Sequence, residues 1–176
     1  MTETAATGGR YRMRRGGSQR KLATRILKAG IVGLGLASTP HLKGYMSHPL
    51  AEVVAVCDLD KARAEEFAAR HGIAQVYTSF ADMLQNPDID IVDIATPTFL
   101  HSRMTRQAAL AGKHVHCEKP FCRSIGEGME ACEAVERSGV KLVVGETYVF
   151  ISSHTKAREL IEEGEIGRPP ANPPTP

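Results

Sequence analysis

Short apolar strands alternate with amphipathic helices along most of the chain, and this alternation constrains the fold more than any other feature. The strands are expected at a segment ending in Ile31-Val32, at Val53–Val56, at Ile89–Ala95, at Val140–Val144, and more weakly near Val76 and Val115. They show little alternation of apolar and polar residues, which is typical of a parallel sheet covered on both faces. The sequence therefore predicts an α/β fold, a doubly wound parallel sheet of about six strands in the order 3-2-1-4-5-6.

Three helices between these strands are predicted from apolar residues that share one face. The faces are Ala64/Phe67/Ala68/His71, Leu100/Met104/Ala108/Ala111 and Ile125/Met129/Cys132/Val135. A glycine follows each helix, where the left-handed conformation ends helices at low cost; these are Gly72, Gly112 and Gly139. Helix starts are indicated where a serine precedes an acidic residue by three positions, at Ser124 with Glu127 and, more weakly, at Ser79 with Asp82.

Charge is distributed unevenly along the chain. The net charge of the 176 residues is +2, yet residues 1–28 contain eight Lys or Arg and one acidic residue. We interpret residues 1–28 as a basic, disordered leader; an export signal around Arg14-Arg15 and a nucleic-acid-binding arm are the functional alternatives. The body is mildly acidic and has no Trp, which argues against a nucleic-acid partner.

Composition also bears on the compartment. No run of about 18 apolar residues is present, so the sequence predicts no membrane partner. Four cysteines without a CxxC pair argue against a disulfide scaffold and for a reducing, cytoplasmic compartment.

The segment Gly30–Ser38 reads GIVGLGLAS and closes the first strand before a helix begins. Gly33 permits a tight turn, and Gly35 leaves room for a pyrophosphate beside the free N–H groups of the helix. Ser38 stands where the fingerprint has its third glycine and is small enough for close packing. This pattern predicts a dinucleotide site.

Asp58 follows the second strand, where an acidic residue binds the ribose hydroxyls of the adenosine. The alternative is that Asp58 caps the helix that begins near Lys61. A carboxylate repels a 2′-phosphate, which favours NAD, while Lys61 and Arg63 keep NADP open as a cofactor.

Three further segments are more specific: Ile94–His101 (IATPTFLH), Ala111–Pro120 (AGKHVHCEKP) and Glu159–Gly167 (ELIEEGEIG). With the glycine turn and His41 after it, they occur in the order found in the Gfo/Idh/MocA family, the glucose-fructose oxidoreductase and inositol dehydrogenase group. The chain resembles this family from about Ala29 to about Arg168, with AGKHVHCEKP as the most specific piece.

The resemblance implies a Rossmann NAD(P)-binding domain and assigns roles to residues in three groups. Pyrophosphate contacts are implied for Gly33, Leu34, Gly35, Leu36 and Ala37, and a ribose contact for Asp58. Positions along the cofactor towards the nicotinamide are implied for Ala95, Thr96, Pro97 and His101. Glu118 and Lys119 are implied beside the nicotinamide, with Lys119 reaching the substrate hydroxyl, and Lys119 and His101 are the candidate catalytic residues.

Each of these candidates has a simpler interpretation. Lys119 could be a surface lysine before a turn-forming Pro120, and His101 could pack locally at a helix start. His114 and His116 alternate along a strand, but without a third ligand pattern we predict no metal site. The resemblance also implies a cis peptide bond before Pro120.

The predicted organisation has a dinucleotide-binding domain at 29–150, a helix at 151–168 and a Pro-rich tail at 169–176. In the family this helix leads to a second domain that holds the substrate pocket and the oligomer interface, and we expect that domain to be absent here. Residues 148–153 (YVFISS) also depart from the Arg-Phe-x-Pro-like stretch of the family.

The expected function is that of the NAD(P)-binding part of an oxidoreductase that transfers hydride between the cofactor and a sugar or polyol hydroxyl. As a truncated chain it should have little activity alone. The alternatives are a stand-alone nucleotide-binding or regulatory module without turnover, and a basic-armed interaction protein that keeps the fold only as a scaffold.

Overall fold

The computed structural model describes residues 25–167, in which six strands form one sheet. The strands are β1 (Leu27–Val32), β2 (Ala51–Cys57), β3 (Gln75–Tyr77), β4 (Ile91–Ile94), β5 (His114–Glu118) and β6 (Leu142–Gly145). Their order is β3-β2-β1-β4-β5-β6, and every neighbouring pair is parallel. The predicted doubly wound parallel sheet and its strand order are confirmed.

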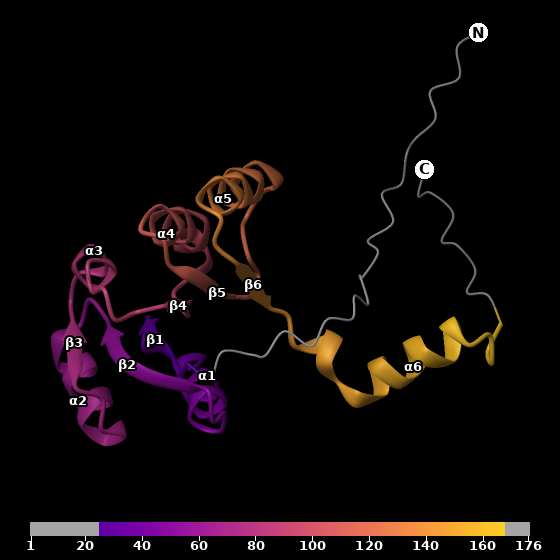
Figure 1. Cartoon of the computed structure of the whole chain (residues 1–176), viewed down its shortest axis with the longest axis horizontal. Coiled ribbons are helices and arrows are strands. Elements are labelled where there is room, and N and C mark those ends of the chain that lie inside the picture. Colours follow the sequence, from indigo (N-terminus) through magenta and orange to yellow (C-terminus); the bar gives the residue numbers. More distant parts are fainter. Residues whose placement is uncertain (1–24, 168–176) are drawn as a thin grey trace, which may run out of the picture.

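Helices cover both faces of this sheet (Figure 1). They are α1 (Ser38–Met46), α2 (Lys61–His71), α3 (Phe80–Leu84), α4 (Thr98–Leu110), α5 (Ile125–Ser138) and α6 (Ser152–Glu162), with a 3₁₀ helix η1 at Thr147–Phe150. Two separate cores follow from this layering. One centres on Ile31, Leu42 and Phe67 beneath α1 and α2, and the other on Met83, Ile94 and Met104 beneath α3 and α4.

Local signals in the sequence correctly mark five helix ends, two starts and three stops. The side chains of Ser124 and Ser79 accept hydrogen bonds from the N–H groups of Glu127 and Asp82, each at 3.2 Å. The three glycines after the helices have positive φ values, 69° at Gly72, 73° at Gly112 and 68° at Gly139. These predicted starts and stops are confirmed.

The predicted buried face of α5 is confirmed for Val135 and wrong for its other three residues. Ile125 and Met129 are 83% and 59% exposed, and Cys132 is exposed too, whereas Ala131 is buried beside Val135. The helix approaches α4 closely, since the Ser102 hydroxyl on α4 donates to the Glu127 carbonyl at 2.7 Å. The close approach turns the small Ala131 inward, while Ile125 and Met129 face outward.

The boundaries of the predicted segments also differ from the structure. β1 begins at Leu27, so the last two residues of the predicted leader belong to the sheet. Arg25, just before β1, pairs with Asp90 at 2.7 Å. The helix predicted within 151–168 is α6, which projects from the body (Figure 1). The rest of the leader and the Pro-rich tail lie outside the described residues.

Within residues 25–167 all four cysteines are free. Among the described helices, none has the length and apolar character needed to cross a membrane.

Candidate dinucleotide and catalytic site

The glycine turn after β1 is pressed against the loop that follows β4. Gly33 has a φ of +86°, and a Cβ atom there would lie 2.8 Å from the Ala95 carbonyl oxygen and 2.8 Å from Thr96 Cγ2. At Gly35, in contrast, no described heavy atom lies within 4 Å of the Cβ position. Gly33 therefore closes the turn, while Gly35 leaves open space on the outside of it.

Replacing Gly33 with alanine should lower the free energy of unfolding by about 2–5 kcal/mol. A left-handed conformation costs a non-glycine residue about 1–2 kcal/mol, and overpacking against backbone adds about 1–3 kcal/mol. Urea unfolding followed by circular dichroism measures this loss. Gly35→Ala is the matched control and should change stability by less than about 1 kcal/mol; equal losses in both variants would contradict the close contact at Gly33.

The start of α1 faces this open space. Leu36 is 98% exposed, and no described side chain caps the helix at Ala37. The Ser38 hydroxyl donates to the Gly35 carbonyl at 2.7 Å, and Ser38 is fully buried, as expected for a small residue in the third fingerprint position. Uncapped N–H groups at a helix start suit a phosphate.

Asp58 joins the end of β2 to the glycine turn. One carboxylate oxygen accepts from the Leu34 N–H at 2.9 Å, and the other from the Asp60 N–H at 2.9 Å. The cap of α2 is Asp60, which accepts from the Arg63 N–H. The alternative that Asp58 caps this helix is therefore wrong.

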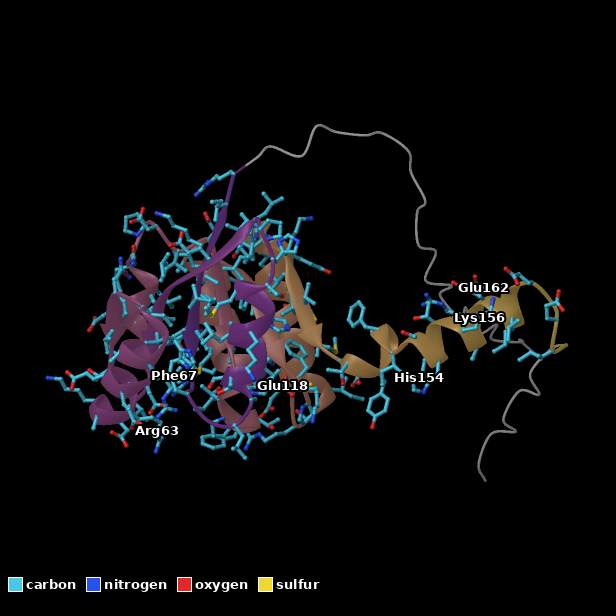
Figure 2. The ribbon with its side chains drawn as sticks, turned by 90° about the horizontal axis from the view of Figure 1, so that it is seen from below. Arg63, Phe67, Glu118, His154, Lys156 and Glu162 are labelled. Carbon is cyan, nitrogen blue, oxygen red and sulfur yellow. The ribbon has the colours of Figure 1, made fainter. Side chains whose placement is uncertain are left out.

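A cavity of about 520 Å³ adjoins this turn, lined by Leu34, Gly35, Leu36, Thr39, Arg63, Glu66, Phe67 and Arg70. Arg63 Nη1 lies 3.4 Å from the carboxylate of Asp58, whereas Lys61 pairs with Glu65 at 3.6 Å. Of the two cations considered for a 2′-phosphate, Arg63 thus borders the cavity. Figure 2 shows Arg63 and Phe67 near one edge of the body.

His101 is a buried link between two loops. It is 1% exposed, with Nε2 at 2.7 Å from the Thr96 carbonyl and Nδ1 at 2.9 Å from the Pro120 carbonyl. Both ring nitrogens therefore face backbone oxygens, which favours the local-packing interpretation. The predicted cis bond between Lys119 and Pro120 is confirmed.

The loop after β4 carries the other predicted cofactor residues. The Ala95 N–H donates to the Val32 carbonyl at 2.9 Å, so this loop continues the β1–β4 pairing. Pro97 is exposed and immediately precedes α4. The structure thus brings Ala95 and Thr96 against Gly33, at the point where strand order reverses in the sheet.

Glu118 and Lys119 stand at the carboxyl end of β5. The Lys119 side chain is 55% exposed, with Nζ at 3.8 Å from Glu118 Oε1. The second oxygen of Glu118 lies 3.0 Å from His41 Nε2. Burial raises the pKa of the neighbouring Cys117 to about 12, so its thiol stays protonated.

A chain of four polar side chains extends from Glu118 into the protein. His41 on α1 approaches Asp93 on β4 at 2.8 Å, and His116 on β5 approaches the other oxygen of Asp93 at 2.8 Å. We call Glu118, His41, Asp93 and His116 the histidine–carboxylate chain. Nothing in the sequence analysis predicted it, although Asp93 stands out as the polar residue in the strand IVDI.

The chain includes a group of metal-ligating type. Potential ligand atoms of His41, Asp93 and His116 all lie within 4.8 Å of one another. Each carboxylate oxygen of Asp93 is paired with one ring nitrogen at a hydrogen-bond distance, and the structure therefore describes a hydrogen-bonded chain.

The electrostatics of the chain follow from its buried carboxylate. Hydrogen bonding to Asp93 raises the pKa of His41 above its ordinary value, and burial opposes this. Burial is the largest single influence on the pKa of Asp93 and raises it, but hydrogen bonds from His116 and His41 outweigh burial and lower it.

Comparisons with known proteins agree with this arrangement. The Gfo/Idh/MocA family model, described as an oxidoreductase family with an NAD-binding Rossmann fold, matches residues 27–146. The chain is 36% identical over 146 residues to the uncharacterized oxidoreductase YrbE of Bacillus subtilis (strain 168), covering 83% of this chain and 43% of that protein. It is 37% identical over 144 residues to scyllo-inositol 2-dehydrogenase (NAD(+)) of the same organism, covering 81% and 42%.

The solved structures to which this chain is similar also include dehydrogenases. The scyllo-inositol dehydrogenase of Lactobacillus casei with NAD(H) and scyllo-inositol aligns with a TM-score of 0.77 and 30% identity, covering 81% of this chain and 43% of that one. The WlbA dehydrogenase of Bordetella pertussis with NADH and UDP-GlcNAcA aligns with a TM-score of 0.78 and 30% identity, covering 82% and 42%. The chain thus spans about two-fifths of the length of these relatives, and the match across most of it shows that it belongs to the Gfo/Idh/MocA family of NAD-binding oxidoreductases.

Proposed function

We propose that this chain binds NAD across the carboxyl ends of β1, β2, β4 and β5 and forms the cofactor-side wall of a dehydrogenase acting on a sugar or polyol hydroxyl. The single observation that carries the proposal is the contact of Gly33 with Ala95 and Thr96. It sets the glycine turn against the loop after β4, at the point where open α/β sheets bind dinucleotides.

The residues around this point fit two parts of the cofactor, the pyrophosphate and the ribose. The open space at Gly35 and the uncapped start of α1 suit the pyrophosphate. Asp58, held by the Leu34 N–H, presents its carboxylate beside the cavity for the ribose hydroxyls. Arg63 beside Asp58 is the residue through which NADP could be accepted.

Lys119 is the proposed acid–base group. NAD held at this site would supply the chemistry of hydride acceptance. Lys119 Nζ would exchange the proton of the substrate hydroxyl, and an ammonium at this place would stabilise the developing alkoxide. His101, with both nitrogens on backbone carbonyls, would act as a positioning residue that ties the Thr96 loop to the Pro120 turn.

The substrate class rests on the relatives. Those named above include dehydrogenases whose names specify scyllo-inositol and a structure that contains UDP-GlcNAcA. A hydroxyl-bearing ring is the chemistry that these names share, and we extend it to this chain.

Replacing Asp58 with alanine should weaken NAD binding by about 1.5–3 kcal/mol, because a charge-assisted hydrogen bond to ribose is lost. The preference for NAD over NADP should narrow in the same variant. Calorimetric titration with both cofactors measures these effects. Asp60→Ala is the matched control: it removes the α2 cap and costs about 1 kcal/mol of stability, but it should leave NAD affinity in place. Unchanged NAD affinity in Asp58→Ala would refute the ribose contact.

A further inference from the structure

The histidine–carboxylate chain begins beside Lys119, passes through the fully buried Asp93 and ends at His116. Its members come from three elements that are far apart in sequence, α1, β4 and β5. The exposed fractions of the side chains are 17% for Glu118, 13% for His41, 0% for Asp93 and 26% for His116. A fully buried carboxylate is costly unless it is paired, so the two histidines are needed where they stand.

The position of His41 between two carboxylates constrains its protons. Nδ1 faces Asp93 at 2.8 Å and Nε2 faces Glu118 at 3.0 Å. A neutral imidazole has one N–H, so one carboxylate would face a nitrogen lone pair. The doubly protonated ring donates to both carboxylates and satisfies the whole arrangement.

We propose that His41, held as an imidazolium by Asp93, is a positioning residue that clamps the Glu118 carboxylate beside Lys119 at the cofactor end of β5. The clamp rests on the function proposed above. It occupies one oxygen of Glu118 and leaves the other, Oε1, facing Lys119 Nζ at 3.8 Å. When His41 loses a proton, the hydrogen bond to one of its two carboxylates is lost and Glu118 is released.

The groups around His41 support this role. Asp93 and Glu118 are the charged side chains that reach it, and the His116 ring lies 4.9 Å from it between centroids. Tyr45, one turn further along α1, stacks edge-on to His116, and burial together with Asp93 raises its pKa, so it stays neutral.

β6 contributes Gly145 to this neighbourhood. A Cβ atom there would lie 3.2 Å from both Glu118 Oε2 and His116 Nε2. A glycine therefore leaves room for the two side chains to meet His41 and Asp93.

The test begins with the protonation of His41 in the full chain. Nitrogen-15 NMR of the ring should show two N–H groups on His41 at pH 7, with a midpoint above its ordinary value of 6.5. Asp93→Asn should lower that midpoint by at least about one pH unit, a tenfold change in the protonation equilibrium. Glu118→Gln, at the carboxyl end of β5, is the second variant and should lower the midpoint less. Asp88→Asn, the same change on an exposed side chain, should not move it.

The second readout is the pH dependence of NAD affinity. Affinity should fall roughly fivefold as pH rises through the His41 midpoint, as expected for one hydrogen bond lost at the site. In Asp93→Asn this fall should move to lower pH together with the midpoint. If His41 had only a structural role, Asp93→Asn would lower NAD affinity equally at all pH values.

The two readouts separate this inference from the proposed function. If His41 carries two N–H groups but the chain does not bind NAD, the protonation that the clamp requires is supported and the proposed function is refuted. A single N–H at pH 7, a midpoint unchanged by Asp93→Asn, or an NAD affinity indifferent to the His41 titration would overturn the clamp. Stoichiometric binding of Zn²⁺ that shifts the ring NMR signals of His41 and His116 would also overturn the clamp. It would identify His41, Asp93 and His116 as a metal site.

Discussion

The 176-residue polypeptide, assayed alone with NAD and a panel of inositols, aldoses and sugar acids, is expected to show no measurable hydride transfer. Transfer requires the substrate carbon at roughly 3–3.5 Å from the nicotinamide and correctly oriented. Lys119 is 55% exposed in the described part of the chain, so its amine faces solvent rather than an enclosed pocket. Without substrate orientation about 7–11 kcal/mol of catalytic advantage is lost. Absorbance of the reduced cofactor measures the rate.

A fusion provides the control for this expectation. Joining the chain to the part of the Bacillus subtilis scyllo-inositol 2-dehydrogenase that lies beyond the matched region should give measurable turnover, and Lys119→Ala should remove it. Robust turnover by the pure polypeptide that Lys119→Ala abolishes would show that the substrate site is complete within these residues. It would also contradict the argument from exposure.

Asp93→Ala should lower the free energy of unfolding by about 3–5 kcal/mol. Asp93 is fully buried and is paired with both His41 and His116. Removing one partner of a buried ionic group leaves the remaining partners without a compensating charge. Denaturant unfolding followed by circular dichroism measures this loss. Asp88→Ala, whose side chain is 60% exposed, should stay within about 0.5 kcal/mol of the parent.

The same interaction should limit stability at both ends of the pH range. The pKa of Asp93 is lowered in the fold, so its contribution is complete above about pH 3.9 and is lost as pH falls through the folded-state value. The pKa of His41 is raised, so its contribution is complete below about pH 6.5 and is lost as pH rises through the folded-state value. Asp93→Ala should flatten both limits, and an unchanged pH profile would contradict the ion pairing.

Local rules predicted the parts of this molecule that local chemistry decides. Gly33 and Gly139 occupy backbone conformations that few other residues tolerate, and Ser124 caps a helix within four residues of chain. The position of Asp58 after β2 was also readable, because the carboxyl ends of parallel strands share one edge of the sheet. The sequence could not show which aspartate caps α2, because Asp58 and Asp60 are both suitable and only the structure shows that Asp60 is the cap.

Features that depend on three-dimensional neighbours could not be predicted in this way. Met129 has the spacing of a core residue, but the close approach of α5 to α4 turns the smaller Ala131 inward. His41 on α1 meets Asp93 on β4 only once the chain has folded, a relation that neither residue signals by itself. The contacts of His101 could not be predicted for the same reason, because its two partners, the Thr96 and Pro120 carbonyls, lie in separate loops.

The central position of β1 has a consequence for how the molecule assembles. Among the described strands, each pairing joins strands that are neighbours in the chain except β1 with β4, where Ala29 meets Ile91. The two halves of the sheet can thus form from nearer contacts, whereas the β1–β4 seam requires a longer loop closure with a larger entropic cost. Gly33 and Ala95 lie on opposite sides of that seam. A dinucleotide bound there would hold the halves together and favour the fully assembled state over any half-folded one.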